Sequence, residues 1–291
     1  MIQQERVADN VYFFQSKTYA EVNAGVVVGP EMAVVIDTLP FPEETKLIKD
    51  FIERDLQVPV GYLINTHYHA DHTWGNYLFP EAKIIGHSLC RSLLIEKGIP
   101  ALEREQSRNA SLEEIYVVLP EITFNHGELL LKVGKKTIRI FSLPGHSIDS
   151  IAVMVEEDRA LFSGDTIMAV PYIVDGDMDV TIESMELIAK MGLENVVQGH
   201  GDIILRGEVE HIMNKNISYL NEVRKAVKKA SRRKYPLDLL EEVDVESCGK
   251  PRVLLNGLAE DLHQNNLAHV YEKMFGEAPL GSEEYYEDGL D

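Results

Sequence analysis

One stretch of the sequence decides the fold and the chemistry of this chain: Asn65-Thr66-His67-Tyr68-His69-Ala70-Asp71-His72-Thr73-Trp74-Gly75-Asn76. Three histidines and one aspartate fall within six positions, although the 291 residues include only ten histidines. Imidazole and carboxylate groups bind zinc, iron and manganese. Side chains two apart at a strand end point the same way, so His67 and His69 can hold one ion together. Asp71 and His72 follow where the chain turns and can face a second ion, which makes a chance cluster of surface histidines the weaker interpretation.

Three further loops each present one residue of a metal-binding type directly after a predicted strand. They are Leu143-Pro144-Gly145-His146-Ser147, Ser163-Gly164-Asp165-Thr166 and Gln198-Gly199-His200-Gly201. In each loop a glycine precedes the histidine or aspartate, and glycine lets the backbone turn sharply and approach an ion closely. A single turn of this kind occurs by chance in many chains. Four such strand ends predict that His146, Asp165 and His200 converge with residues 67–72 on one site.

The segments around these loops alternate between short strands and helices. Val-, Ile- and aromatic-rich runs indicate strands, and apolar residues three to four apart indicate helices. The predicted strands are 11–14, 22–28, 32–36, 59–64, 84–85, 129–133, 137–141, 151–155, 159–162 and 196–197. The predicted helices are 42–56, 88–96, 182–191, 209–233 and 258–275, and residues 112–120 show no clear period. This order suggests helices that cover stacked sheets.

Composition excludes several classes of protein. Hydrophobic residues make up 45% of the chain, too many for a disordered protein. With 28 Lys and Arg against 48 Asp and Glu, the net charge is −20, which disfavours nucleic acid as a partner. Because we find no apolar run of about 18 residues and no leader after the polar start, we expect a cytoplasmic protein that binds no membrane. The two cysteines, Cys90 and Cys248, are expected to be free and packed as small apolar groups.

The HxHxDH run at 67–72, followed by His146, Asp165 and His200, resembles the metallo-β-lactamase superfamily in order and spacing. Asp37, which follows an apolar run, matches the first motif of that family. The resemblance implies an α/β fold, a four-layer αββα sandwich of two mixed sheets covered by helices. It also implies two divalent metal ions at one rim of the sheets, zinc first, with iron or manganese as alternatives.

The same resemblance implies a role for each ligand residue. The first metal would be held by His67, His69 and His146, and the second by Asp71, His72 and His200. Asp165 would bind both metals. Asp37 would orient the histidine loop from behind. Zinc β-lactamases with a Cys ligand carry it where this chain has Asp165, and flavodiiron proteins carry Glu in place of His69, so both fit poorly. The set looks most like the branch of glyoxalase II, lactonases, phosphodiesterases and related hydrolases.

Two metal ions about 3.5–4 Å apart can share a water and lower its pKa towards neutrality. The bridging hydroxide would attack a small ester, thioester, lactone or lactam substrate. Asp71 or Asp165 would relay the proton. Asp71 is preferred because a carboxylate that bridges two metals is less available to accept a proton. The alternatives are a phosphodiesterase, a mononuclear iron sulfur dioxygenase acting on a persulfide, and a non-catalytic binding protein on a decayed fold. The intact ligand set speaks against the last, and the charge of −20 speaks against an RNA-processing nuclease.

Four residues outside the ligand set are assigned smaller roles. His263 lies near the start of the last predicted helix. Because late helices of this superfamily reach the site in several branches, it is a candidate for orienting a ligand, although a lone histidine is more often structural. Tyr68 in the metal loop and Tyr172 in the loop after Asp165 are candidates for binding substrate. Trp74 is expected to pack beneath the metal loop.

Three aspartates, Asp175, Asp177 and Asp179, alternate with other residues in the loop after Asp165. Their spacing does not complete a calcium loop, so we interpret them as solvated. The basic residues near the end of the predicted helix 209–233 are interpreted as cations at a helix C-terminus.

We expect a single domain over residues 1–280, of which 206–280 form a C-terminal helical part. An acidic tail at 281–291 is expected to be disordered. A homodimer is expected only because symmetric dimers are common among soluble enzymes.

Overall fold

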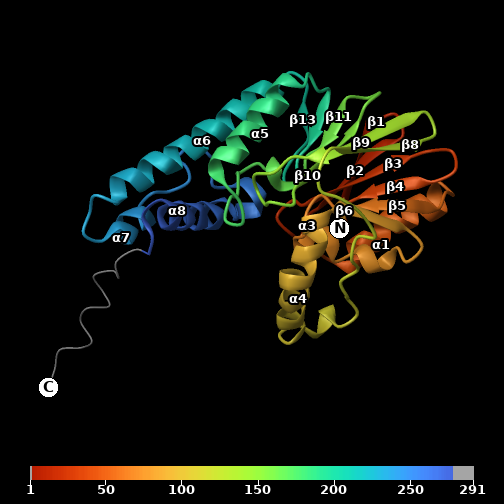
Figure 1. Ribbon diagram of the computed structural model, residues 1–291, viewed down its shortest axis with the longest axis horizontal. Helices are drawn as coiled ribbons and strands as arrows, with labels where there is room; N and C mark the ends of the chain where they lie inside the picture. Colours follow the sequence, from red (N-terminus) through yellow and green to blue (C-terminus); the bar gives the residue numbers. More distant parts are fainter. Residues whose placement is uncertain (1, 278–291) are drawn as a thin grey trace.

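A computed structural model describes residues 2–277, and the acidic tail at 281–291 lies outside the described residues. Two β-sheets lie face to face, with helices on the outer face of each (Figure 1). The first sheet contains seven strands in sequence order. They are β1 (Ile2–Ala8), β2 (Val11–Ser16), β3 (Asn23–Val28), β4 (Ala33–Ile36), β5 (Val60–Ile64), β6 (Lys83–His87) and β7 (Ile122–Phe124). Strands β1 to β4 pair antiparallel and β4 to β7 pair parallel, so this sheet is mixed.

The second sheet contains six strands in the order β13-β12-β11-β10-β9-β8. They are β8 (Glu128–Val133), β9 (Lys136–Ser142), β10 (Ile151–Val155), β11 (Ala160–Phe162), β12 (Asn195–Val197) and β13 (Ile204–Leu205). Only β11 and β12 pair parallel in this set. The two predicted hairpins form as β8–β9 and β10–β11. Strand β1 was missed because it is polar and partly exposed at a sheet edge, and β7 because it has only three residues.

The helices flank these sheets. They are α1 (Pro42–Asp50), α2 (Ala70–Thr73), α3 (Ser88–Leu93), α4 (Ile99–Gln106), α5 (Met178–Lys190), α6 (Val209–Ala230), α7 (Pro236–Glu241) and α8 (Ala259–Phe275). Two π-helical stretches, η1 (Phe51–Asp55) and η3 (Leu94–Gly98), extend α1 and α3. Helix α4 was not predicted, because Gly98 and Pro100 interrupt the helical pattern after residue 96.

Three apolar clusters define the layers. One lies between the sheets and joins Ile64 of β5 to Ile138 of β9. A second packs Leu63, on the other face of β5, against Ile48 of α1. The third packs the outer face of β10 and β11 against α5, α6 and α8. This arrangement confirms the four-layer αββα sandwich.

Two other features follow the sequence analysis. Cys90 and Cys248 are free and buried, as predicted. Within residues 2–277, no helix has both the length and the apolar composition needed to cross a membrane.

Candidate metal centre

The four predicted loops meet at one rim of the sandwich. Ile151 N donates to Thr66 O at 2.9 Å and so joins the two sheets at the histidine loop, while Gly199 N donates to Gly164 O at 2.9 Å. Two groups of side chains result, each with its ligand atoms within 4.8 Å of one another. The groups are His67, His69, His146 and Asp165, and Asp71, His72 and His200. All seven residues proposed as ligands are therefore brought together, in the grouping that the family resemblance implied.

Asp165 stands between the two groups. Its Oδ2 lies 3.7 Å from His67 Nε2, 3.6 Å from His146 Nε2 and 3.3 Å from His200 Nε2. Its Oδ1 lies 3.1 Å from His72 Nε2. The carboxylate therefore faces histidines of both groups, which is the position expected of a bridging ligand.

Each of the five histidines has one ring nitrogen held by a partner outside the two groups. His72 Nδ1 and His69 Nε2 donate to the carboxylates of Asp37 (3.0 Å) and Asp175 (2.9 Å). The remaining three rings donate from Nδ1: His67 to Thr66 Oγ1 (3.1 Å), His146 to Tyr172 O (2.7 Å) and His200 to Ala20 O (2.9 Å). Such partners fix the tautomer and the orientation of metal-binding imidazoles.

The nitrogens opposite these donors point into the centre, where those of the neutral His67 and His146 rings present lone pairs. His69 Nδ1 and His146 Nε2 lie 2.9 Å apart, although each has its ring proton on the other nitrogen. One buried nitrogen in the centre, His67 Nε2, has no hydrogen-bond partner among the described residues. Converging lone pairs repel one another and unpaired buried acceptors are costly, and cations relieve both. The donor set therefore fits divalent metal ions.

Asp37 lies behind the histidine loop, as expected. Its Oδ1 accepts from Thr66 N at 2.7 Å, and its Oδ2 accepts from Thr66 Oγ1 at 2.6 Å as well as from His72. Its backbone has a φ of +57°, a left-handed conformation that Asp adopts more readily than most residues. One buried side chain thus fixes the strand end that precedes His67 and the ring of His72.

The charges in the centre compensate one another. Burial lowers the pKa of His67 far below its usual value and lowers that of His146 to about 4, so both rings are neutral. Burial also opposes the charging of His72 and His200, but Asp165 outweighs it and raises the pKa of His200 to about 10. For Asp165, burial raises the pKa, and His200 and His72 lower it well below the usual value. Metal binding displaces protons from such ligands.

All three aspartates of the loop are exposed, as the interpretation of a solvated loop predicted, but Asp175 also contacts the centre. Besides His69, it accepts a hydrogen bond from the Tyr68 hydroxyl and pairs with Lys97 Nζ at 3.4 Å. The hydrogen bonds from His69 and Tyr68 hold the pKa of Asp175 below its usual range. Its neighbour Asp177 caps α5 by accepting from the backbone N of residues 179 and 180. The sequence contained the alternating aspartates but not their partners, which come from distant segments.

The remaining candidates lie at different distances from the centre. Tyr68 lines a cavity beside it, whereas Tyr172 contributes its backbone carbonyl to His146. His263 contacts none of the seven ligands, because it accepts from the Tyr219 hydroxyl (3.0 Å) and donates to Val243 O (3.1 Å) between the C-terminal helices. Tyr19 is exposed and lies outside the cavity wall, and its pKa is raised to about 12, first by the charge of Asp71 and then by burial.

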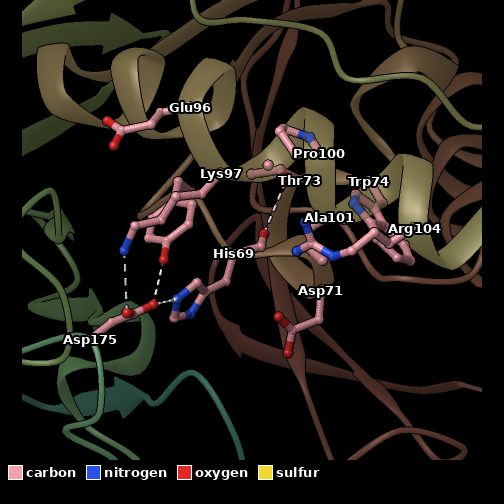
Figure 2. A pocket seen from close by; sticks show the side chains of 13 residues that line it. His69, Asp71, Thr73, Trp74, Glu96, Lys97, Pro100, Ala101, Arg104 and Asp175 are labelled. Atoms are coloured by element: carbon pink, nitrogen blue, oxygen red, sulfur yellow. Dashed lines mark hydrogen bonds and ion pairs between the residues drawn. The ribbon is translucent and has the colours of Figure 1, made fainter.

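A cavity of about 510 Å³ opens beside the centre, with His69 and Asp71 in its wall (Figure 2). This volume is within the range of small-molecule sites. Trp74 also lines the cavity and packs against the cluster around Leu102, rather than lying beneath the metal loop. The opposite wall is formed by residues of the helical segment 96–104.

The fold and the site define a class of protein: an αββα sandwich with a histidine- and aspartate-rich centre at the rim of its sheets. The chain belongs to the metallo-β-lactamase superfamily, whose family model matches residues 19–233.

Similar proteins agree with this assignment. The lactamase-like protein nscB of Aspergillus fumigatus is 29% identical over 151 residues, which cover 50% of this chain and 38% of that protein. The thioesterase pkgB of Emericella nidulans is 28% identical over 151 residues, 52% of this chain and 37% of that protein. The chain thus spans less than half the length of these curated relatives. A solved metallo-β-lactamase from Pontibacter korlensis superposes with a TM-score of 0.61 at 19% identity over 74% of this chain and 98% of that one, which shows the fold.

Proposed function

We propose that this chain is a metal-dependent hydrolase of a small-molecule ester, thioester, lactone or lactam, with a thioester or ester as the first choice. The observation that carries the proposal is the pair of ligand groups facing one Asp165 carboxylate beside a cavity of about 510 Å³. The relative named as a thioesterase supports the choice of carbonyl chemistry. The net charge of −20 supports a small molecule over nucleic acid as partner, and two free cysteines fit the reducing cytoplasm.

The ligand groups suit two divalent cations, for which zinc is our first choice. His67, His69 and His146 would hold one and Asp71, His72 and His200 the other, with Asp165 shared. When bound, such ions activate water as a nucleophile and polarise the carbonyl that it attacks.

Asp71 and Asp165 differ in what they can do with a proton. The Asp165 side chain is 4% exposed and is surrounded by four histidine rings. The Asp71 side chain is 15% exposed, lies in the cavity wall and places Oδ2 3.2 Å from His200 Nε2. We therefore assign the proton relay to Asp71 and the shared ligand to Asp165.

The test combines metal analysis with a substrate panel. Wild-type protein is expected to contain about two zinc ions per chain and to cleave a thioester or ester among thioester, lactone, phosphodiester and β-lactam probes. His67→Ala and Asp165→Ala are expected to lose metal and to lower turnover at least about 100-fold, because each removes a ligand. His126→Ala, which changes an exposed loop histidine, is the control. It is expected to keep the metal content and the turnover of the wild-type protein.

Other results would replace this proposal. One iron per chain with oxygen uptake on a persulfide indicates a dioxygenase, and turnover of the phosphodiester alone indicates a phosphodiesterase. Unchanged metal content and turnover in both ligand variants would refute the assignment of the site.

A further inference from the structure

The cavity beside the metal centre contains a cation without a partner. Arg104 lines it from α4, and within residues 2–277 its guanidinium makes no hydrogen bond or ion pair. Figure 2 shows its side chain extending from the helix towards the segment with His69 and Asp71. Arginine presents a planar set of donors that matches a carboxylate in bidentate geometry. A free guanidinium at this place is therefore available to a ligand.

The other cation of the cavity is already engaged. Lys97 Nζ pairs with Asp175 Oδ1 at 3.4 Å and lies 5.5 Å from the centre of the Tyr68 ring. Its role is to hold Asp175 and Tyr68 in place next to His69. Glu96, in the same wall, points away from His69 and Asp71 in Figure 2. These contacts leave Arg104 as the cavity residue suited to an anion.

The helical segment that carries Arg104 shapes the cavity wall. Lys97, Pro100, Ala101 and Arg104 follow the spacing i, i+3, i+4 and i+7 that places side chains on one face of a helix. The two middle side chains are small and leave room between the cationic ends, and Trp74 adds an aromatic surface. This side of the cavity is therefore apolar at Pro100, Ala101 and Trp74, and the Arg104 cation lies beside that apolar surface.

From this geometry we propose that Arg104 binds a carboxylate of the substrate, whose apolar body lies along Pro100, Ala101 and Trp74. The inference rests on the proposed function for the reacting bond, which would lie on the His69 and Asp71 side. It adds the substrate class, an amphipathic monocarboxylate. A dianion such as a phosphate monoester fits less well, because Glu96 and Asp175 line the same cavity and the whole chain is acidic.

The cavity contains its own reporter for a test. Trp74 is the only tryptophan of the chain and lies in the cavity wall, so its fluorescence follows ligand binding without turnover. The probes are 3-phenylpropanoate and its uncharged analogue 3-phenylpropanamide, titrated into the protein as purified. Wild-type protein is expected to bind the carboxylate at least about tenfold more tightly than the amide, the range of a charge-assisted hydrogen bond.

Variants assign the preference to one side chain. Arg104→Met is expected to bind both probes within about twofold, and Arg104→Lys to retain part of the preference. Arg108→Met is the matched control, because Arg108 is exposed, pairs only with Glu105 at 3.3 Å and lies outside the cavity wall; it keeps the full preference. Far-UV circular dichroism and the melting temperature establish that each variant is folded.

Two results would overturn the proposal. Equal or undetectable binding of the carboxylate by wild-type protein shows that the cavity does not select an anion. A preference that survives in Arg104→Met places the anion on the metal centre instead. Because the assay reads binding alone, a protein that cleaves none of the panel substrates rejects the proposed function without deciding this inference.

Discussion

The five histidines of the centre are held by three chemically different kinds of partner. Carboxylates hold His69 and His72, a hydroxyl holds His67, and backbone carbonyls hold His146 and His200. These partners decide which ring nitrogen faces the centre. His69 differs from the others because its Nε2 is held and its Nδ1 points inward.

Asp175 offers a sharp test of this orienting role. Asp175→Ala removes the acceptor of His69 and Tyr68, so we expect metal affinity to fall about 10–100-fold, the usual cost of losing a partner of a metal ligand. Asp175→Asn, which keeps an acceptor oxygen, is expected to lose less. Competition with a chromogenic chelator measures the affinity. Asp179→Ala, which breaks an exposed pair with Arg224, is the control, and wild-type affinity in Asp175→Ala would show that His69 needs no anchor.

At the scale of elements, the loops of the centre depend on close backbone approach. A Cβ built on Gly199 would lie 1.8 Å from Asp165 Oδ1, inside the carboxylate. The strand end that delivers His200 therefore touches the residue that both ligand groups share. Any side chain at this position must displace Asp165.

Gly199→Ala is accordingly expected to lower metal affinity at least tenfold and to destabilise the fold by about 1–3 kcal/mol, the range for overpacking a filled site. Gly207→Ala is the matched control, because a Cβ there meets nothing within 4 Å. The metal content and the free energy of unfolding in urea are measured for both variants. If the two alanine variants behave alike, the contact between Gly199 and Asp165 does not constrain the centre.

The helical segment of the cavity wall shows where local pattern misleads. The sequence predicted a helix ending at residue 96, whereas the chain continues through η3 and α4 to Gln106. Gly98 lies at the end of the π-helical stretch and Pro100 in the first turn of α4, where its missing N–H costs little. The residues that usually stop a helix therefore mark a change of helix type, and Arg104 reaches the cavity as a result.

At the scale of the molecule, the C-terminal helices support the metal centre from outside. Asn266 of α8 donates to Pro171 O at 2.7 Å and accepts from Ile173 N at 3.0 Å. The residue between them, Tyr172, supplies the carbonyl that holds His146. His263 belongs to the same network two hydrogen bonds away, through the Tyr219 hydroxyl.

Asn266→Ala leaves two backbone groups without partners, so we expect the free energy of unfolding to fall by about 1–3 kcal/mol. Urea unfolding followed by Trp74 fluorescence and by far-UV circular dichroism is expected to give one shared midpoint, lowered equally for both probes. Trp74 fluorescence reports on the histidine loop, whereas most of the circular dichroism signal comes from α5, α6 and α8. An equal shift of the two unfolding midpoints therefore supports a single domain over residues 1–280. Separate midpoints would show that the helical part unfolds on its own.

The sequence by itself determined the seven ligand-type residues, because each follows a predicted strand end, and their resemblance to the superfamily implied the two-sheet fold. It could not supply the partners of those ligands. Asp175, Ala20, Tyr172 and Asn266 act through contacts between segments far apart in the chain. Only the tertiary structure decided which nitrogen of each ring faces inward and which cation remains free in the cavity. Both depend on packing between distant elements, and such packing produces no periodic pattern in the sequence.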